Sequence, residues 1–116
     1  MLARFLEDVT DGDLISPRRM AERLRVPMTK LSKLAHVNRN ALADQPASMK
    51  VQAKLGEIAQ VIAKASELTG DDSRAIIWFK HQPITGYGMT AERLVEIGRA
   101  DLVLEHLERI DEGVYS

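Results

Sequence analysis

The chain has 116 residues, which is the size of one small domain or of two helical modules that share a core. Apolar residues make up 45% of it and charged residues 28%, a composition typical of a folded protein and unlike that of a disordered tail or a membrane span. It has no cysteine, which excludes disulfides, thiolate metal sites and cysteine nucleophiles. Large multi-domain enzymes are excluded by length.

Neither a membrane span nor a secretory signal is expected. The sequence has no uncharged apolar run of eighteen or more residues. Arg4, Glu7 and Asp8 come too early for the apolar region of a signal peptide. We therefore expect a cytoplasmic protein that makes no contact with a membrane.

The net charge of −1 hides an uneven distribution of charge along the chain. Residues 1–15 hold one arginine and four carboxylates, a net charge of −3. Residues 16–56 hold nine cations and two carboxylates (+7), and residues 57–116 hold six cations and eleven carboxylates (−5). A basic middle segment produces a local positive field that attracts polyanions. A solvated helix face without any partner is the alternative interpretation.

A short amphipathic helix is predicted at the start of the chain. Leu2, Phe5, Leu6 and Val9 recur at the spacing of one helix face, which indicates a helix over residues 2–9. The polar sequence that follows this helix ends it.

Two further short helices are predicted next. Ser16 followed by Pro17 is typical of an N-cap with proline at the first helical position. Val26 and Pro27 force a break, because the residue before a proline avoids helical dihedral angles. The expected ranges are 17–24 and 28–36, with a further turn of helix at 39–42.

The longest predicted helix runs over about residues 49–69, capped by Ser48 and closed by Gly70. Its apolar positions step by four, three, four and three, which makes a heptad stripe. This pattern is typical of a central core helix onto which the other helices pack. A dimer seam is the alternative.

The C-terminal part is also predicted to be helical, with almost no strand anywhere in the chain. Asp71 or Asp72 caps one helix, and Thr90 caps another. Trp78 and Phe79 are expected in the core. The expected ranges are 73–81, 91–98 and 100–110, with a turn at Gly86-Tyr87-Gly88.

The two short helices over residues 17–36 have the spacing of a helix–turn–helix. Two helices cross steeply only if a small residue lies at their contact, and Ala21 supplies it. Arg25 stands where such turns usually have glycine. In a helix–turn–helix the second helix offers its outer face to the DNA major groove. The candidate DNA contacts are Met28, Thr29, Ser32, Lys33 and His36 on that face, with Arg18, Arg19, Lys30 and Arg39 flanking it to reach phosphates. A helical hairpin that touches no DNA has the same pattern.

No enzymatic site is expected. His36, His81 and His106 lie far apart, no two of them at helical spacing, so the sequence predicts no metal site. No phosphate-binding glycine loop follows a strand. We therefore expect no catalytic residue and no cofactor.

The last three residues have two interpretations. Tyr115 comes two residues after Gly113, at the very end of the chain, with little core to join. Terminal residues usually fray. Alternatively, Val114-Tyr115-Ser116 is an insertion peptide that orders against a partner, with tyrosine as its anchor.

The order of motifs from about residue 16 to 116 resembles that of antitoxins of the Xre/MbcA/ParS type. The residues that carry the resemblance are Asn38-Arg39-Asn40-Ala41-Leu42, Ala75 to Trp78, Pro83, Gly86, Thr90-Ala91-Glu92-Arg93-Leu94, Gly98-Arg99-Ala100, Val103, Leu107, Ile110 and Gly113. The sequence departs from the family at Ala91, where proline is frequent, and at Arg25 in the turn.

The resemblance implies a partner and a role. Members of the family pair with a RES-domain toxin that attacks NAD or modifies proteins with ADP-ribose. They neutralise it with the C-terminal module and repress their own operon with the N-terminal one. The residues that the resemblance implies on the toxin side are Arg99, the final helix with Glu105 and Glu108, and the tail Gly113, Val114, Tyr115 and Ser116.

The sequence thus predicts an all-α protein with two parts. Residues 1–47 form a helix–turn–helix DNA-binding module, and residues 48–116 form the central helix and a small helical toxin-binding module. The expected role is that of an antitoxin and autorepressor that binds its cognate RES-domain toxin and operator DNA as a homodimer. The alternative is a stand-alone helix–turn–helix regulator whose C-terminal half serves dimerisation or ligand binding.

Overall fold

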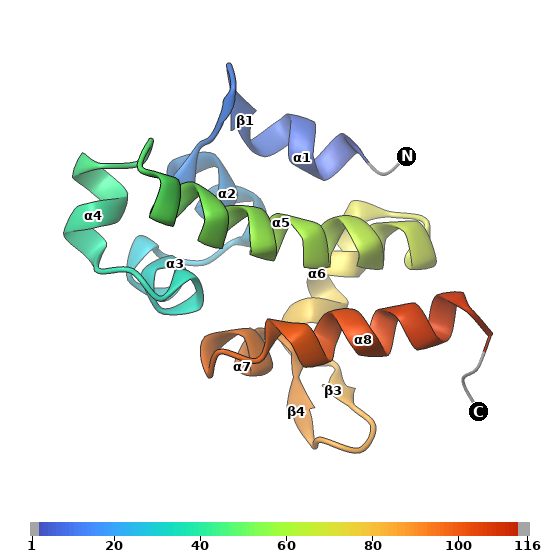
Figure 1. Cartoon of the computed structure of the whole chain (residues 1–116). Coiled ribbons are helices and arrows are strands. Elements are labelled where there is room, and N and C mark those ends of the chain that lie inside the picture. The colour runs from blue at the N-terminus through green and yellow to red at the C-terminus, as the bar shows by residue number, and fades with distance from the viewer. Residues whose placement is uncertain (1–2, 114–116) are drawn as a thin grey trace.

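The protein is all-α, as predicted. A computed structural model describes residues 3–113, and Figure 1 shows their arrangement. None of the helices in that range is long and apolar enough to cross a membrane. The helices are α1 (Ala3–Val9), α2 (Pro17–Leu24), α3 (Met28–Ala35), α4 (Arg39–Asp44), α5 (Met49–Thr69), α6 (Asp72–His81), α7 (Ala91–Glu96) and α8 (Ala100–Asp111).

Two small antiparallel hairpins interrupt the helices. β1 (Thr10–Asp11) pairs with β2 (Leu14–Ile15) between α1 and α2. β3 (Pro83–Ile84) pairs with β4 (Met89–Thr90) between α6 and α7, with the predicted glycine turn at its tip. These strands are not predicted from the sequence, because two residues are too few to show an alternating pattern.

Side-chain caps explain why most helix starts could be predicted. The side chains of Ser16, Asn38, Ser48, Asp71 and Thr90 each accept a hydrogen bond from the backbone N–H three residues later. The predicted end of the helix over residues 91–98 is wrong, since α7 stops at Glu96. Arg99 N donates to Leu94 O at 2.7 Å there, which closes the helix early, with Gly98 at a φ of 87°.

The long helix α5 is the centre of the molecule. Figure 1 shows α1 along one side of it and α8 along the other, and both helices contact it. The heptad stripe, from Val51 through Leu55, Ile58 and Ile62 to Ala65, is at most 1% exposed. The core-helix interpretation of the stripe is therefore confirmed, and the protein's own helices cover it.

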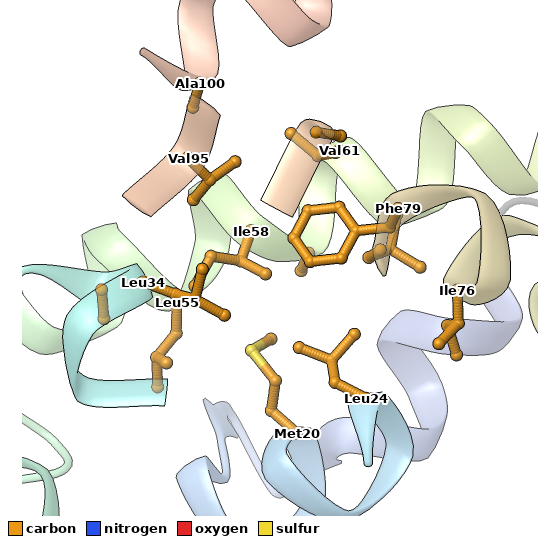
Figure 2. Packing of buried hydrophobic residues seen from close by; sticks show 14 of the residues in the cluster. Met20, Leu24, Leu34, Leu55, Ile58, Val61, Ile76, Phe79, Val95 and Ala100 are labelled. Atoms are coloured by element: carbon orange, nitrogen blue, oxygen red, sulfur yellow. The ribbon is translucent and has the colours of Figure 1, made fainter. Parts of the chain in front are cut away.

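One continuous core joins the N-terminal and C-terminal parts. Figure 2 shows Met20 and Leu24 of α2 and Leu34 of α3 pointing toward Ile58 of α5, and Val95 of α7 approaches from the other side. All belong to a single cluster of buried residues. The two predicted segments, 1–47 and 48–116, thus share a core.

The apolar run on α6 divides between the core and the surface. Phe79 is fully buried, as expected. Trp78 is only partly buried against the core, and Ile77 is 61% exposed. The expectation of a core position is confirmed for Phe79 and is too strong for Trp78, because successive residues on a helix point in different directions.

Candidate nucleic-acid interface

Helices α2 and α3 are the two helices of the predicted helix–turn–helix, and they contact each other. Ala21, the small residue expected at the contact of the two helices, is only 5% exposed. Arg25 takes a left-handed conformation, with φ of 59° and ψ of 48°. This is the conformation that glycine usually supplies in such a turn. The turn therefore has its required shape even though an arginine stands in it.

The turn is also fixed from the C-terminal half. Lys80 Nζ of α6 donates to the carbonyl oxygens of Leu24 and Arg25, at 3.0 and 2.9 Å. These carbonyls end α2, where a cation is favourable. This contact could not be predicted from the sequence, because Lys80 lies more than fifty residues away along the chain.

Helix α3 has an inner and an outer face. Leu31, Leu34 and Ala35 are buried against the rest of the protein. Thr29 and Lys33 are exposed, and Ser32 is half-buried between them. The outer face thus carries a cation and two hydroxyl groups, a set that can reach base edges or phosphates.

The start of α3 can accept an anion. Pro27 occupies its N-cap without a side-chain hydrogen bond. The first N–H groups of a helix have no acceptor within it. A shallow groove beside Pro27 and Met28 is lined by Arg18 and Arg25, with Glu22 as the one carboxylate of its lining. Two arginines next to an uncapped helix start favour a phosphate group.

Several cations of the basic segment are free to meet a partner. Arg18, Arg25, Lys33 and Arg39 are exposed. Within residues 3–113 their side chains form no ion pair and no hydrogen bond; the same holds for Lys50 and Lys54 on α5. Arg25 was not among the predicted contacts, although its charge and its place in the turn were visible in the sequence.

Two predicted phosphate contacts bind other parts of the protein. Arg19 Nη1 donates to Thr10 O of β1 at 2.9 Å. Lys30 Nζ lies 3.2 Å from Glu96 Oε1 of α7. Their side chains thus support α2 and α3 from the flanks and are already engaged within the protein.

His36 also links α3 to α7. It ends α3 in a left-handed conformation with φ of 56°, and its Nε2 lies 3.1 Å from Val95 O. Its ring also packs near Gly98. His36 therefore has a structural contact, although it remains exposed at the edge of the predicted reading face.

Glu96 is the ionic centre of this contact between α3 and α7. Burial disfavours its carboxylate, but hydrogen bonds from Lys30 and Arg93 outweigh that cost and lower the pKa of Glu96. The ion pair thus holds the basic helix α3 against the acidic C-terminal half.

The predicted toxin-side residues lie on the solvent side of the C-terminal helix. Arg99 makes two hydrogen bonds of 3.0 Å to the Asp101 carboxylate, which lower the pKa of Asp101. Glu105 accepts from Arg109 at 2.7 Å, and Glu108 is exposed. Gly113 follows α8 with φ of 74°. Val114, Tyr115 and Ser116 lie outside the described residues.

The three histidines lie on three different helices and have different surroundings. Within the described range, no group of three or more histidine and carboxylate side chains is arranged to hold a metal ion. His36 contacts α7 and His81 ends α6, while burial lowers the pKa of His106 on α8, with Arg109 adding to the effect.

Comparisons of the chain with protein families, with curated proteins and with solved structures found no match.

Proposed function

We propose that this protein is a DNA-binding antitoxin that places α3 in the major groove of its operator. The observation that carries the DNA-binding part is the set of exposed, unpartnered cations around α2 and α3: Arg18, Arg25, Lys33 and Arg39. DNA phosphates are the partner that such a set attracts most strongly, because each neutralised phosphate releases bound counterions. A homodimer would supply the second half-site contact that one helix–turn–helix lacks.

The outer face of α3 would supply the sequence reading. Thr29 and Lys33 lie one helical turn apart on its exposed side. Arg18 and Arg25 would position the helix by contacting backbone phosphates beside its N-terminus. The proposed interface is therefore smaller than the predicted one and includes Arg25.

The DNA-binding part is tested with the full chain and a fluorescent duplex from its own promoter region. We expect the logarithm of the association constant to fall linearly with the logarithm of salt concentration, and promoter DNA to bind more tightly than a shuffled duplex of the same length. Absence of binding at low salt would overturn this part of the proposal.

The antitoxin part rests on the resemblance stated above and on the acidic side of α8. Asp101, Glu105 and Glu108 lie exposed on that helix. A toxin that handles the phosphates of a dinucleotide needs an electropositive site, and complementary fields speed the encounter of two proteins. The test is co-expression of the tagged chain with the product of the adjacent gene. We expect co-purification and relief of growth arrest; failure of both would overturn this part.

A stand-alone regulator is the competing function, and one structural feature favours it. Helix α7 packs directly on α3 through the Lys30–Glu96 and His36–Val95 contacts. The C-terminal half thus has a role in fixing the recognition helix even without a toxin. DNA binding without capture of the neighbouring gene product would support this function over the antitoxin.

A further inference from the structure

Lys80 differs from the other cations of the described C-terminal half, because it is half-buried and has no carboxylate partner. Its side chain crosses from α6 to the end of α2. There Nζ donates to Leu24 O at 3.0 Å and to Arg25 O at 2.9 Å. These two carbonyls are consecutive in the chain. A single ammonium group therefore holds the two peptide groups on either side of the Arg25 Cα.

This pair of contacts selects the backbone conformation of Arg25. The two soft dihedral angles of a residue set the relative direction of the peptide groups that flank it. In an extended conformation the two carbonyls point to opposite sides, so one ammonium group could not reach both. In a helical conformation of either hand they point the same way. The right-handed form would continue α2, so the left-handed form, with φ of 59° and ψ of 48°, is the one that suits a turn.

The same two peptide groups are also held at their N–H ends. Arg25 N donates to Glu22 O at 3.1 Å, and Val26 N donates to Ala21 O at 3.0 Å. These bonds close the last turn of α2. They oppose the penalty that a left-handed conformation carries for a residue with a Cβ. Lys80 adds the bonds at the carbonyl ends, and it adds them from the other half of the chain.

The conformation of Arg25 determines where the proposed DNA-binding groups lie. Arg25 lines the groove beside the start of α3 together with Arg18, and Lys80 is not part of that lining. Helix α3 begins at Met28, three residues after Arg25. A different backbone at Arg25 would move its guanidinium group and turn the outer face of α3 relative to α2.

We propose that Lys80 is a positioning residue for DNA binding. It stabilises the left-handed turn at Arg25 and so holds α3 and the Arg25 side chain in the geometry that meets phosphates, without contacting DNA itself. This inference rests on the proposed DNA-binding function. It adds that the affinity of the helix–turn–helix depends on a side chain of the C-terminal half. If only a fraction of the molecules had the competent turn, the apparent affinity would fall by that fraction.

The test measures binding of the full chain to the promoter duplex by fluorescence anisotropy. Lys80→Met keeps the aliphatic part of the side chain and removes its donors. It should weaken binding about tenfold, the effect of leaving the left-handed penalty unopposed. Arg74→Met is the matched control, since Arg74 is an exposed cation of the same helix that makes no side-chain hydrogen bond or ion pair within the described residues. It should change affinity by less than about twofold, because its charge acts only through a screened field.

Pairing Lys80→Met with Arg25→Gly separates positioning from a general structural role. Glycine adopts the left-handed conformation without penalty. In the Arg25→Gly background, Lys80→Met should therefore weaken binding by less than about threefold. Equal losses in the two backgrounds would overturn the proposal. It would also be overturned if Lys80→Met flattened the salt dependence by about one unit in that background, because Lys80 itself would then contact a phosphate.

The same measurements distinguish this inference from the proposed function. If the unaltered chain fails to bind its promoter at low salt, the DNA-binding function is overturned and the inference with it. If the unaltered chain binds and Lys80→Met binds equally well, only the inference is overturned. If Lys80→Met lost its helical circular-dichroism signal, Lys80→Gln, which removes the charge but stays polar, would take its place in both backgrounds with the same expectations.

Discussion

The two halves of the molecule use their cations in opposite ways. In residues 16–56, most cations, among them Arg18, Lys33 and Arg39, have no side-chain partner within the described range. In the C-terminal half, Lys64, Arg93, Arg99 and Arg109 all pair with carboxylates, and Lys80 binds backbone carbonyls. Among the described residues of the C-terminal half, Arg74 alone is exposed without a side-chain partner, so the unpaired cations are concentrated in the first half.

This difference is one of charge and not of stability, because both halves share one core. Exposed ion pairs such as Arg109–Glu105 each add at most about 1 kcal/mol to the free energy of unfolding. Burial of the shared apolar residues contributes far more. The two halves should therefore fold together and differ only in what they attract.

Phe79→Ala should have the largest effect and tests the shared core. The side chain is fully buried, so its loss should lower the free energy of unfolding by about 3–5 kcal/mol. Because α6 and α2 belong to the same cluster, DNA binding at the other half should fall as well. Urea denaturation, followed by circular dichroism, measures the effect. The matched control is Ile77→Ala, an exposed neighbour on the same helix, which should change stability by less than about 0.5 kcal/mol.

Separate unfolding transitions for the two halves in Phe79→Ala would contradict the shared core.

The double variant Arg18→Gln/Lys33→Gln comes next and tests the free cations. If each side chain contacts one phosphate, the salt dependence of DNA binding should flatten by about two units. The matched control is Arg99→Gln/Arg109→Gln, which removes two exposed cations that are already paired with carboxylates of α8. Fluorescence anisotropy over a range of salt concentrations gives both slopes. Equal flattening in the two double variants would mean that net charge alone, and not the α2–α3 surface, governs binding.

Arg25→Gly should change stability and DNA affinity in opposite directions. The left-handed conformation at this position strains any residue with a Cβ, so glycine should raise the free energy of unfolding by about 1 kcal/mol. The same change should weaken DNA binding, because it removes a cation from the groove. Arg18→Gly, in a regular turn of α2, should instead lower stability by about 1 kcal/mol. Loss of stability in Arg25→Gly would show that the arginine side chain itself supports the turn.

The smallest expected effect is a loss of stability on acidification. The pKa of His106 is lowered from its usual 6.5 by burial and by Arg109, so the folded state favours the neutral ring. Its contribution is therefore present above pH 6.5 and is lost as the pH falls through that value toward the folded pKa. The Glu96 carboxylate has a lowered pKa, so its contribution is present above its usual 4.5 and is lost at still lower pH.

Urea denaturation above and below pH 6.5 should show the first loss, and His106→Gln should abolish it. A pH profile unchanged by His106→Gln would place the titration elsewhere.

The sequence predicted most of the helices because their ends are marked locally. Ser16 with Pro17, and Ser48 with Gly70, set boundaries that the structure reproduces for α2 and α5. The ion pair of Lys30 could not be predicted in the same way. Its partner Glu96 lies 66 residues further along the chain, and only the packing of α7 on α3 brings the two together.

The outer face of α3 was partly predictable for a related reason. Helical periodicity alone separates Thr29 and Lys33 from the buried leucines. It could not show that Arg25 would take a left-handed conformation and join the groove, because local spacing does not report backbone dihedral angles.

Because α7 packs on α3, neither end of this protein can be exchanged without affecting the other. A chimera that joined residues 1–47 to an unrelated C-terminal partner would expose Leu34 and leave Lys30 and His36 without the groups they now contact. A change of the proposed DNA specificity, by selection or by design, would therefore require substitutions of the solvent-facing side chains of α3. The C-terminal half that packs on α3 would have to be kept.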